Sequence, residues 1–194
     1  MNANGVLSFG RSFTDASSGG SNFNTVSSPP IIAPFWNDVD VRRGGAIYYR
    51  QDNSSLNADQ VQQDINTQFP DIEFYPSLVF VATWDRVGRF GHRGLANTFQ
   101  VVIASDGEQT FVGFSYRDIQ WGGSRTLIGI SAGDGINFIT HPASLSPNVT
   151  SLLDNTTTIY GINSKLGHDN IIVCYCLNLW SLVDRCYNYT TMFC

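Results

Sequence analysis

Short apolar runs alternate along most of this chain with turns rich in Gly, Pro, Asn and Ser, the pattern of a β-rich domain. Four short strands are predicted, at residues 6–9, 46–50, 78–84 and 126–131. The run at 78–84 is β-branched and aromatic with little polarity, which predicts a central strand. The apolar run at 31–36 contains Pro34. Because proline cannot donate a ladder hydrogen bond, this run predicts an edge strand or an extended segment.

The clearest local signal is a hairpin. Residues 98–104 and 110–116 are both rich in β-forming residues, and Asp106-Gly107 lies between them. An Asp-Gly pair in this setting favours a type I′ turn, whose two central residues both need positive φ. The sequence therefore predicts a hairpin at Asp106-Gly107, in an antiparallel sheet that also holds residues 78–84.

One helix is predicted, near residues 57–68. Val61, Ile65 and Phe69 recur every four residues and form one apolar stripe, and Asn57 can cap the first turn. A single helix among many strands predicts a mostly β (α+β) fold. The expected architecture is an antiparallel β-sandwich-like domain in which the helix covers one sheet face.

Length and charge narrow the function classes. The 194 residues fit one domain, with or without a tail. Charged residues make up only 14% of the chain, the net charge is −5, and no Lys/Arg run occurs. This excludes nucleic acid as the expected partner and argues against binding to an anionic membrane surface. No apolar run is long enough to span a bilayer, and residues 1–4 do not resemble a secretory signal.

All four cysteines lie in the last 21 residues, at Cys174, Cys176, Cys186 and Cys194. The rest of the chain therefore cannot be a disulfide scaffold. The spacing of the four does not match a zinc finger or ribbon, so free or irregularly paired thiols are expected.

Five blocks carry a family resemblance and cover roughly residues 4–161. They are NGVLSFG at 4–10, IAPFWNDVD at 32–40, VATWDRVG at 81–88, NTFQVVIASDG at 97–107 and IGISAGDG at 128–135. In this order they resemble the NIDO domain, an extracellular module of nidogen and alpha-tectorin. The resemblance implies a secreted or cell-surface module of cell–matrix adhesion, with partners among extracellular matrix or cell-surface proteins and no enzyme activity. It offers no catalytic or ligand-contact residues to carry over.

The resemblance also divides the chain. Its first block starts at residue 4, which leaves no room for a signal peptide, and after Gly161 the expected aromatic closing strand is replaced by Cys- and Leu-rich sequence. We therefore expect a NIDO-like extracellular domain at residues 1–167. Residues 168–194 are expected to be a divergent tail, the end of a fragment or an artefact of the gene model.

Asp38 and Asp40 form the main candidate site. Side chains at i and i+2 of a strand share one face, so the two carboxylates suit a Ca²⁺ ion, or less readily the acid–base pair of a glycosidase, with Asp85 as a third carboxylate. The alternative is structural: strand-end aspartates bind turn amides or pair with arginines. The candidate arginines are Arg42, Arg43 and Arg86. The alternative function is accordingly a carbohydrate-binding or calcium-dependent β domain.

Three tryptophans, Trp36, Trp84 and Trp121, suit either a sugar-stacking platform or the core, and core packing is the expected role because tryptophan in a β domain is mostly buried. The histidines belong to no metal or nucleophile motif; they are His92, His141 and His168.

Four sequons are candidate N-glycosylation sites, at Asn53, Asn148, Asn155 and Asn188. The first three lie in predicted loops, where a glycan can be carried. The sequons permit secretion but do not establish it.

Overall fold

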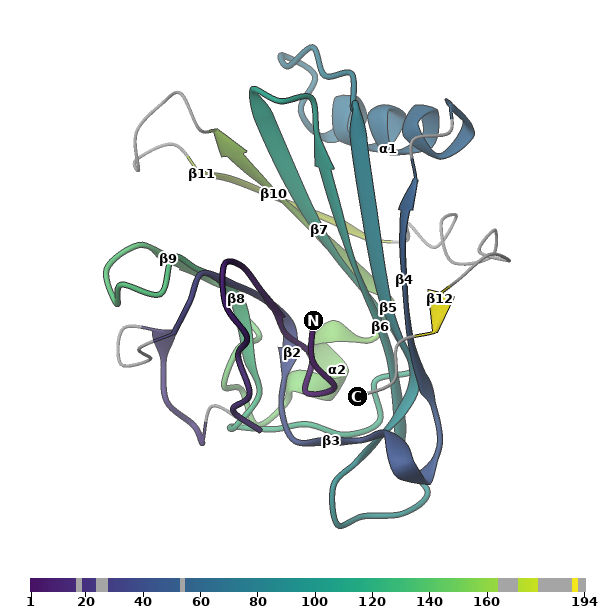
Figure 1. Ribbon diagram of the computed structural model, residues 1–194, viewed down its shortest axis with the longest axis vertical. Coiled ribbons are helices and arrows are strands. Elements are labelled where there is room, and N and C mark those ends of the chain that lie inside the picture. The colour runs from purple at the N-terminus through teal and green to yellow at the C-terminus, as the bar shows by residue number, and fades with distance from the viewer. Residues whose placement is uncertain (17–18, 24–27, 53–54, 164–170, 178–189, 192–194) are drawn as a thin grey trace.

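The computed structural model describes residues 1–16, 19–23, 28–52, 55–163, 171–177 and 190–191 (Figure 1). Two antiparallel sheets face each other. The smaller has the order β1-β2-β8-β9 and the larger β11-β10-β7-β6-β5-β4-β12, with β3 also paired to β5. The smaller sheet consists of β1 (Leu7–Ser8), β2 (Ile31–Trp36), β8 (Leu127–Ser131) and β9 (Phe138–Thr140). The larger consists of β3 (Val39–Asp40), β4 (Ala46–Asp52), β5 (Leu78–Arg89), β6 (Ala96–Ser105), β7 (Gln109–Arg117), β10 (Thr156–Asn163), β11 (Ile171–Leu177) and β12 (Thr190–Thr191). The predicted mostly β, antiparallel fold is confirmed.

The larger sheet buries both of its faces. Successive side chains of a strand point to opposite sides, so on β5 Val79 and Val81 lie in one apolar cluster while Ala82 and Trp84 lie in another. The first cluster faces α1 (Ser55–Gln68), and the second fills the space between the two sheets. The near-continuous apolar run at residues 78–84 follows from this double burial.

The predicted covering helix is confirmed as α1. Its stripe of Val61 and Ile65, continued by Phe69 just past the helix end, is buried against β5, β6, β7 and β10. The helix begins at Ser55, two residues earlier than expected, so the prediction that Asn57 caps it is wrong. Two short helices were not predicted, the 3₁₀ helix η2 (Val41–Arg43) and α2 (Val149–Leu153).

The hairpin of β6 and β7 is confirmed, with Ser105 paired to Thr110. The Asp106 N–H donates to the Gln109 carbonyl at 3.2 Å, so the two central residues of the turn are Gly107 and Glu108. The predicted type I′ turn is wrong, since Gly107 has a φ of +95° but Glu108 is absent from the non-glycine residues with positive φ. Positive φ at the first central residue alone is the pattern of a type II′ turn. The Asp106 carboxylate accepts hydrogen bonds from the backbone N–H groups of Glu108 and Gln109 and so holds the turn.

The strand that contains Pro34 is not at a sheet edge. β2 is buried along its whole length, between β1 and β8. Pro34 is accommodated because the register of β2 against β8 shifts between Ala33 and Trp36, and β1 pairs only with Ile31 and Ile32. The missing N–H of proline therefore costs no ladder hydrogen bond.

β10 was not predicted as a strand. It pairs with β7 over seven positions, yet it opens with three threonines, of which Thr157 and Thr158 are buried. The run therefore shows neither the alternation nor the apolar content by which a strand is recognised.

We predict that removing every residue after Gly167 leaves the domain folded. The truncation removes β11 and β12, the two edge strands of the larger sheet, each of which pairs with a single neighbour, β10 or β4. Loss of these two edge strands should cost about 1–2 kcal/mol, a fall in Tm of about 2–8 °C for a domain of this size. Calorimetry of the two chains measures this. A much larger fall, or failure to fold, would show that the tail is integral.

Candidate functional site

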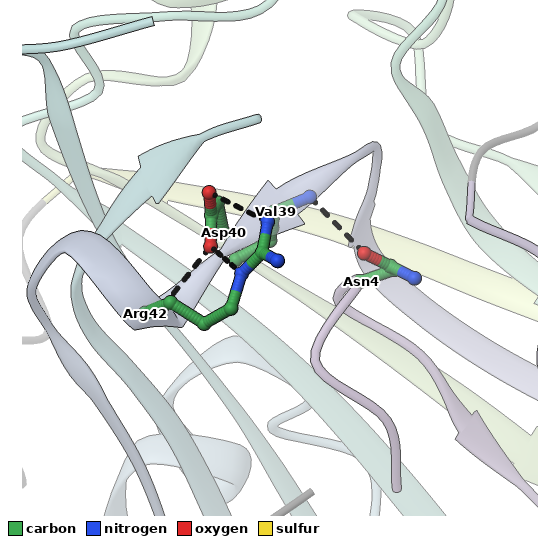
Figure 2. A network of polar contacts seen from close by, with 4 residues as sticks. All are labelled: Asn4, Val39, Asp40 and Arg42. Carbon is green, nitrogen blue, oxygen red and sulfur yellow. Dashed lines mark hydrogen bonds and ion pairs between the residues drawn. The ribbon is translucent and has the colours of Figure 1, made fainter. Parts of the chain in front are cut away.

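The segment around Asp38 is fixed by the N-terminus of the chain. The Asn4 side-chain Oδ1 accepts a hydrogen bond from the Val39 N–H at 3.1 Å (Figure 2), and the Asn4 carbonyl accepts one from the Asn37 N–H at 3.2 Å. The side-chain amide of Asn37 donates in turn to Thr126 Oγ1 at 2.8 Å. The N-terminal segment, the 32–40 block and the start of β8 are thereby joined.

Asp40 is committed to an arginine. Its Oδ1 accepts from the Arg42 N–H at 3.1 Å and from Arg42 Nε at 2.8 Å, while Oδ2 accepts from Nη2 at 3.1 Å (Figure 2). Asp40 is only 3% exposed, whereas the Arg42 side chain is 72% exposed. The pKa of Arg42 is raised, first by the hydrogen bond to Asp40, then by the charge of Asp40 and that of Asp38.

This geometry bears on the calcium hypothesis. Asp38 precedes β3, so only Asp40 lies on the strand that we expected to present both carboxylates. A calcium ion at Asp40 would have to displace the Arg42 guanidinium from both oxygens. Among the described residues no group of three His, Cys, Asp or Glu side chains is placed to hold a metal. Asp85 lies apart, 3.5 Å from Arg86 Nε. The Arg43 side chain is outside the described part, and a Ca²⁺ site at Asp38 and Asp40 stays a prediction.

The three candidate tryptophans are core residues, as expected. Trp36, Trp84 and Trp121 are all 3% exposed or less. Each indole N–H donates to a backbone carbonyl from another segment, so none is left unsatisfied. The acceptors are Asp15 for Trp36, Asn2 and Ala3 for Trp84, and Val87 for Trp121. A sugar platform needs exposed ring faces, so these rings cannot provide one.

Of the two described histidines, His141 is buried and His92 is exposed. The Nδ1 of His141 accepts a hydrogen bond from the Ala143 N–H at 3.0 Å, which leaves Nε2 as the protonated nitrogen, 3.1 Å from Thr158 Oγ1. Burial lowers the pKa of His141 to about 4. His92 is exposed in the turn between β5 and β6, and His168 lies outside the described residues.

Two of the four sequons can be placed. Asn148 and Asn155 are both exposed, at the two ends of α2, and are available to a glycan. Asn53 and Asn188 lie outside the described residues.

Asn97 is a structural residue that the sequence did not single out. It is fully buried, donates to the Trp121 carbonyl at 2.8 Å and accepts from the N–H groups of Gln120 and Trp121 at 2.7 and 3.0 Å. The sequence signal for this role was an asparagine near the start of a mostly apolar strand, where a buried polar side chain must find hydrogen-bond partners.

The comparisons with known proteins identify the domain. A family model described as the nidogen-like (NIDO) domain matches residues 1–163. The chain belongs to the nidogen-like domain family. Alpha-tectorin from Mus musculus is 32% identical over 176 residues, which cover 80% of this chain and 8% of alpha-tectorin. Nidogen-1 from Rattus norvegicus is 34% identical over 107 residues, which cover 50% of this chain and 33% of that sequence. No solved structure gave a significant match.

A third relative is dendrite extension defective protein 1 from Caenorhabditis elegans, 33% identical over 130 residues, which cover 65% of this chain and 11% of that protein. The match thus covers between 8% and 33% of the length of these three relatives. No helix among the described residues is both long and apolar enough to cross a bilayer. The resemblance drawn from the five blocks is confirmed, and the structure explains the first block by the contacts of Asn4 and of its neighbour Gly5.

Gly5 gives a direct test of that block. It has a φ of +77°, and a Cβ at this position would lie 2.1 Å from the Phe35 carbonyl oxygen. Gly10 has nearly the same φ, +78°, with nothing within 4 Å. We predict that Gly10→Ala costs only the strain of the left-handed backbone, about 1–2 kcal/mol. Gly5→Ala should cost at least about 3 kcal/mol, because the backbone of β2 must also move. Denaturant unfolding measures both, and equal losses would refute the close approach.

We also predict a pH dependence from His141. Its pKa is lower in the folded chain, about 4, than the ordinary 6.5 of the unfolded chain. The unfolded state therefore binds more protons between these values. The stability from neutral His141 is complete above pH 6.5 and is lost as the pH falls from 6.5 towards 4, by about 3 kcal/mol in total. Unfolding free energies across this window should be flatter for His141→Gln than for the wild type. The exposed His92→Gln should keep the wild-type slope, and a slope retained by His141→Gln would contradict the assignment.

Proposed function

We propose that this nidogen-like domain is a non-enzymatic interaction module of an extracellular matrix protein, and that it contributes to cell–matrix adhesion. Its partners are then matrix or cell-surface proteins that bind the outer surface of the sandwich. Family membership supports the extracellular setting.

The commitment of reactive side chains to the fold is the observation that carries the proposal. Asp40 is bound by Arg42, the imidazole of His141 is held between a backbone N–H and a hydroxyl, and the three tryptophans are buried. A catalytic carboxylate pair needs a cleft and one carboxyl group with a raised pKa. Asp40 instead faces a permanent cation that favours its ionised form. These side chains support a rigid scaffold that presents a surface, which is how an adhesion module works.

The experiment is retention in a deposited matrix. The domain, fused to a secretory leader, is expressed in matrix-producing fibroblasts beside an unrelated secreted β domain of similar size and charge. We expect the nidogen-like domain to remain in the washed matrix and the unrelated domain to remain in the medium. Equal partition of the two would contradict the adhesion role. Hydrolysis of matrix glycans by the purified domain would overturn the non-enzymatic assignment.

The calcium alternative has its own test in the variant Asp38→Asn/Asp40→Asn. Asparagine is also a good cap, so we predict that the variant folds and stays in the matrix. Its Tm should fall only slightly, because the asparagine oxygen can still accept the Arg42 backbone N–H and the Arg42 guanidinium is exposed enough to be solvated by water. Tm is then measured for both chains in millimolar calcium and in chelator. A ligand that binds the folded state raises Tm. Because we expect no calcium to bind, we expect no difference in Tm between the two conditions. A calcium-dependent rise in the wild type that the variant lacks would establish the metal site instead.

A further inference from the structure

One end of the larger sheet gathers arginines. η2 and the start of β4 meet the turn between β5 and β6 there, at the lower end of the molecule in Figure 1. The two segments are tied by the pairing of Val39 with Arg89 and by the hydrogen bond from the Phe90 N–H to the Asp38 carbonyl. Four exposed arginines lie on η2, the end of β5 and the turn after it, out of eleven Lys and Arg residues in the chain: Arg42, Arg86, Arg89 and Arg93. We call these four, with His92, the basic end.

Three residues of the basic end, Arg86, His92 and Arg93, line an open cavity of about 530 Å³, a volume in the range of binding sites for small groups. Charged, histidine and glycine residues make up most of its wall. The lining consists of Gly44, Arg86, Gly88, His92, Arg93, Gly94, Leu95 and Ala96. With three glycines in the lining, a ligand can approach the backbone closely while the arginine heads reach it from the rim.

Arg86 stands in a conformation that its side chain does not favour. Its φ is +51°, at the point where the pairing of β5 with β6 shifts register between Trp84 and Val87. The bulge is held by a hydrogen bond from the Arg86 N–H to Thr98 Oγ1 at 3.1 Å. Gly45 packs against it so closely that a Cβ at residue 45 would clash with the Arg86 carbonyl. Asparagine or glycine would hold this backbone at lower cost. Bulges re-aim side chains and occur beside functional sites. The fold therefore does not explain why an arginine occupies this position, and its exposed guanidinium points to a functional role.

The nearby carboxylates do not cancel the basic end. Asp40 is buried beneath Arg42, and Asp85 lies beside Arg86. Neither Arg89 nor Arg93 has an ion-pair partner in the described part of the chain. Since the whole chain carries −5, this local excess of positive charge contrasts with an acidic remainder.

The chemistry of the basic end selects the ligand. All four cations are arginines, whose planar forks bind sulfate and carboxylate groups through two parallel hydrogen bonds. Exposed Phe90 lies beneath the Arg42 guanidinium, 5.5 Å from the ring centroid to Cζ, so its ring supports a cation and does not form an apolar anchor. The cores of protein interfaces are depleted of charge, whereas this surface carries four exposed arginines.

We propose that the basic end binds the sulfate groups of a sulfated glycosaminoglycan chain. This adds a polysaccharide partner to the adhesion role and rests on it only for the extracellular setting. Binding between purified components tests this proposal separately from the matrix-retention experiment. A negative binding result would leave the matrix-retention result unchanged, and a negative retention result would leave the binding result unchanged.

Heparin is the probe, immobilised on a column and also titrated in solution. We expect the wild-type domain to be retained at low salt and released by a NaCl gradient, because the contacts are screened. Arg89→Ala/Arg93→Ala should weaken the Kd by about tenfold or more, since each bidentate arginine contact is a strong one. Arg11→Ala/Arg125→Ala makes the same charge change in loops beside the smaller sheet, and should elute with the wild type.

Arg86→Asn separates binding from folding. Asparagine accepts the positive φ of the bulge, so the Tm should stay at or above that of the wild type while heparin binding weakens. Desulfated heparin should not be retained. The proposal is overturned if the wild type passes through at low salt, if both double variants weaken binding equally, or if desulfated heparin binds as well as heparin. It is also overturned if Leu95→Ala weakens binding more than the arginine variants, which would indicate an apolar protein site.

Discussion

Aromatic packing between the two sheets is the contact on which the rest of the structure depends. Phe35 of β2 lies 5.2 Å from the ring of Phe99 on β6 and 5.3 Å from that of Trp121, and Phe99 stacks on Trp84 of β5 at 5.0 Å. The four rings are almost completely buried. Burying one such ring contributes about 1.5–3 kcal/mol or more, so this cluster holds the smaller sheet on the larger one.

The burial of these rings dictates the backbone around them. A buried indole N–H needs an acceptor, and for Trp84 the chain supplies the carbonyls of Asn2 and Ala3. The N-terminal segment must therefore cross over β5, and it passes so close to Phe35 that only glycine fits at residue 5. Tyr116 adds a second tie between the sheets, with its hydroxyl donating to the Pro34 carbonyl at 2.8 Å. Four of the five family blocks thus meet at this contact, through Gly5, Phe35, Trp84 and Phe99.

The same arrangement separates support from recognition. Side chains inside the sandwich are fixed by packing and by hydrogen bonds, whereas the turn between β5 and β6 extends past the sheet and leaves its arginines in solvent. Asp40 lies at the boundary: its buried carboxylate caps η2 and orients Arg42, whose guanidinium faces outwards. The sequence suggested Asp40 as a metal ligand, and in this structure its carboxylate positions the Arg42 guanidinium.

Local chemistry by itself determined several features of this protein. The stripe through Val61 and Ile65 specified α1, and Asp106-Gly107 specified the hairpin, because both signals act between residues close in sequence. The five blocks specified the family. Only the tertiary structure decided the roles of Asp40, Pro34 and the threonines of β10, because each depends on a partner far along the chain or on a shift of register that leaves no local trace. Burial of Trp36, Trp84 and Trp121 was expected, but which carbonyls would satisfy them was not. A cluster such as the basic end, built from two segments some forty residues apart, exists only once the strands that carry them are paired.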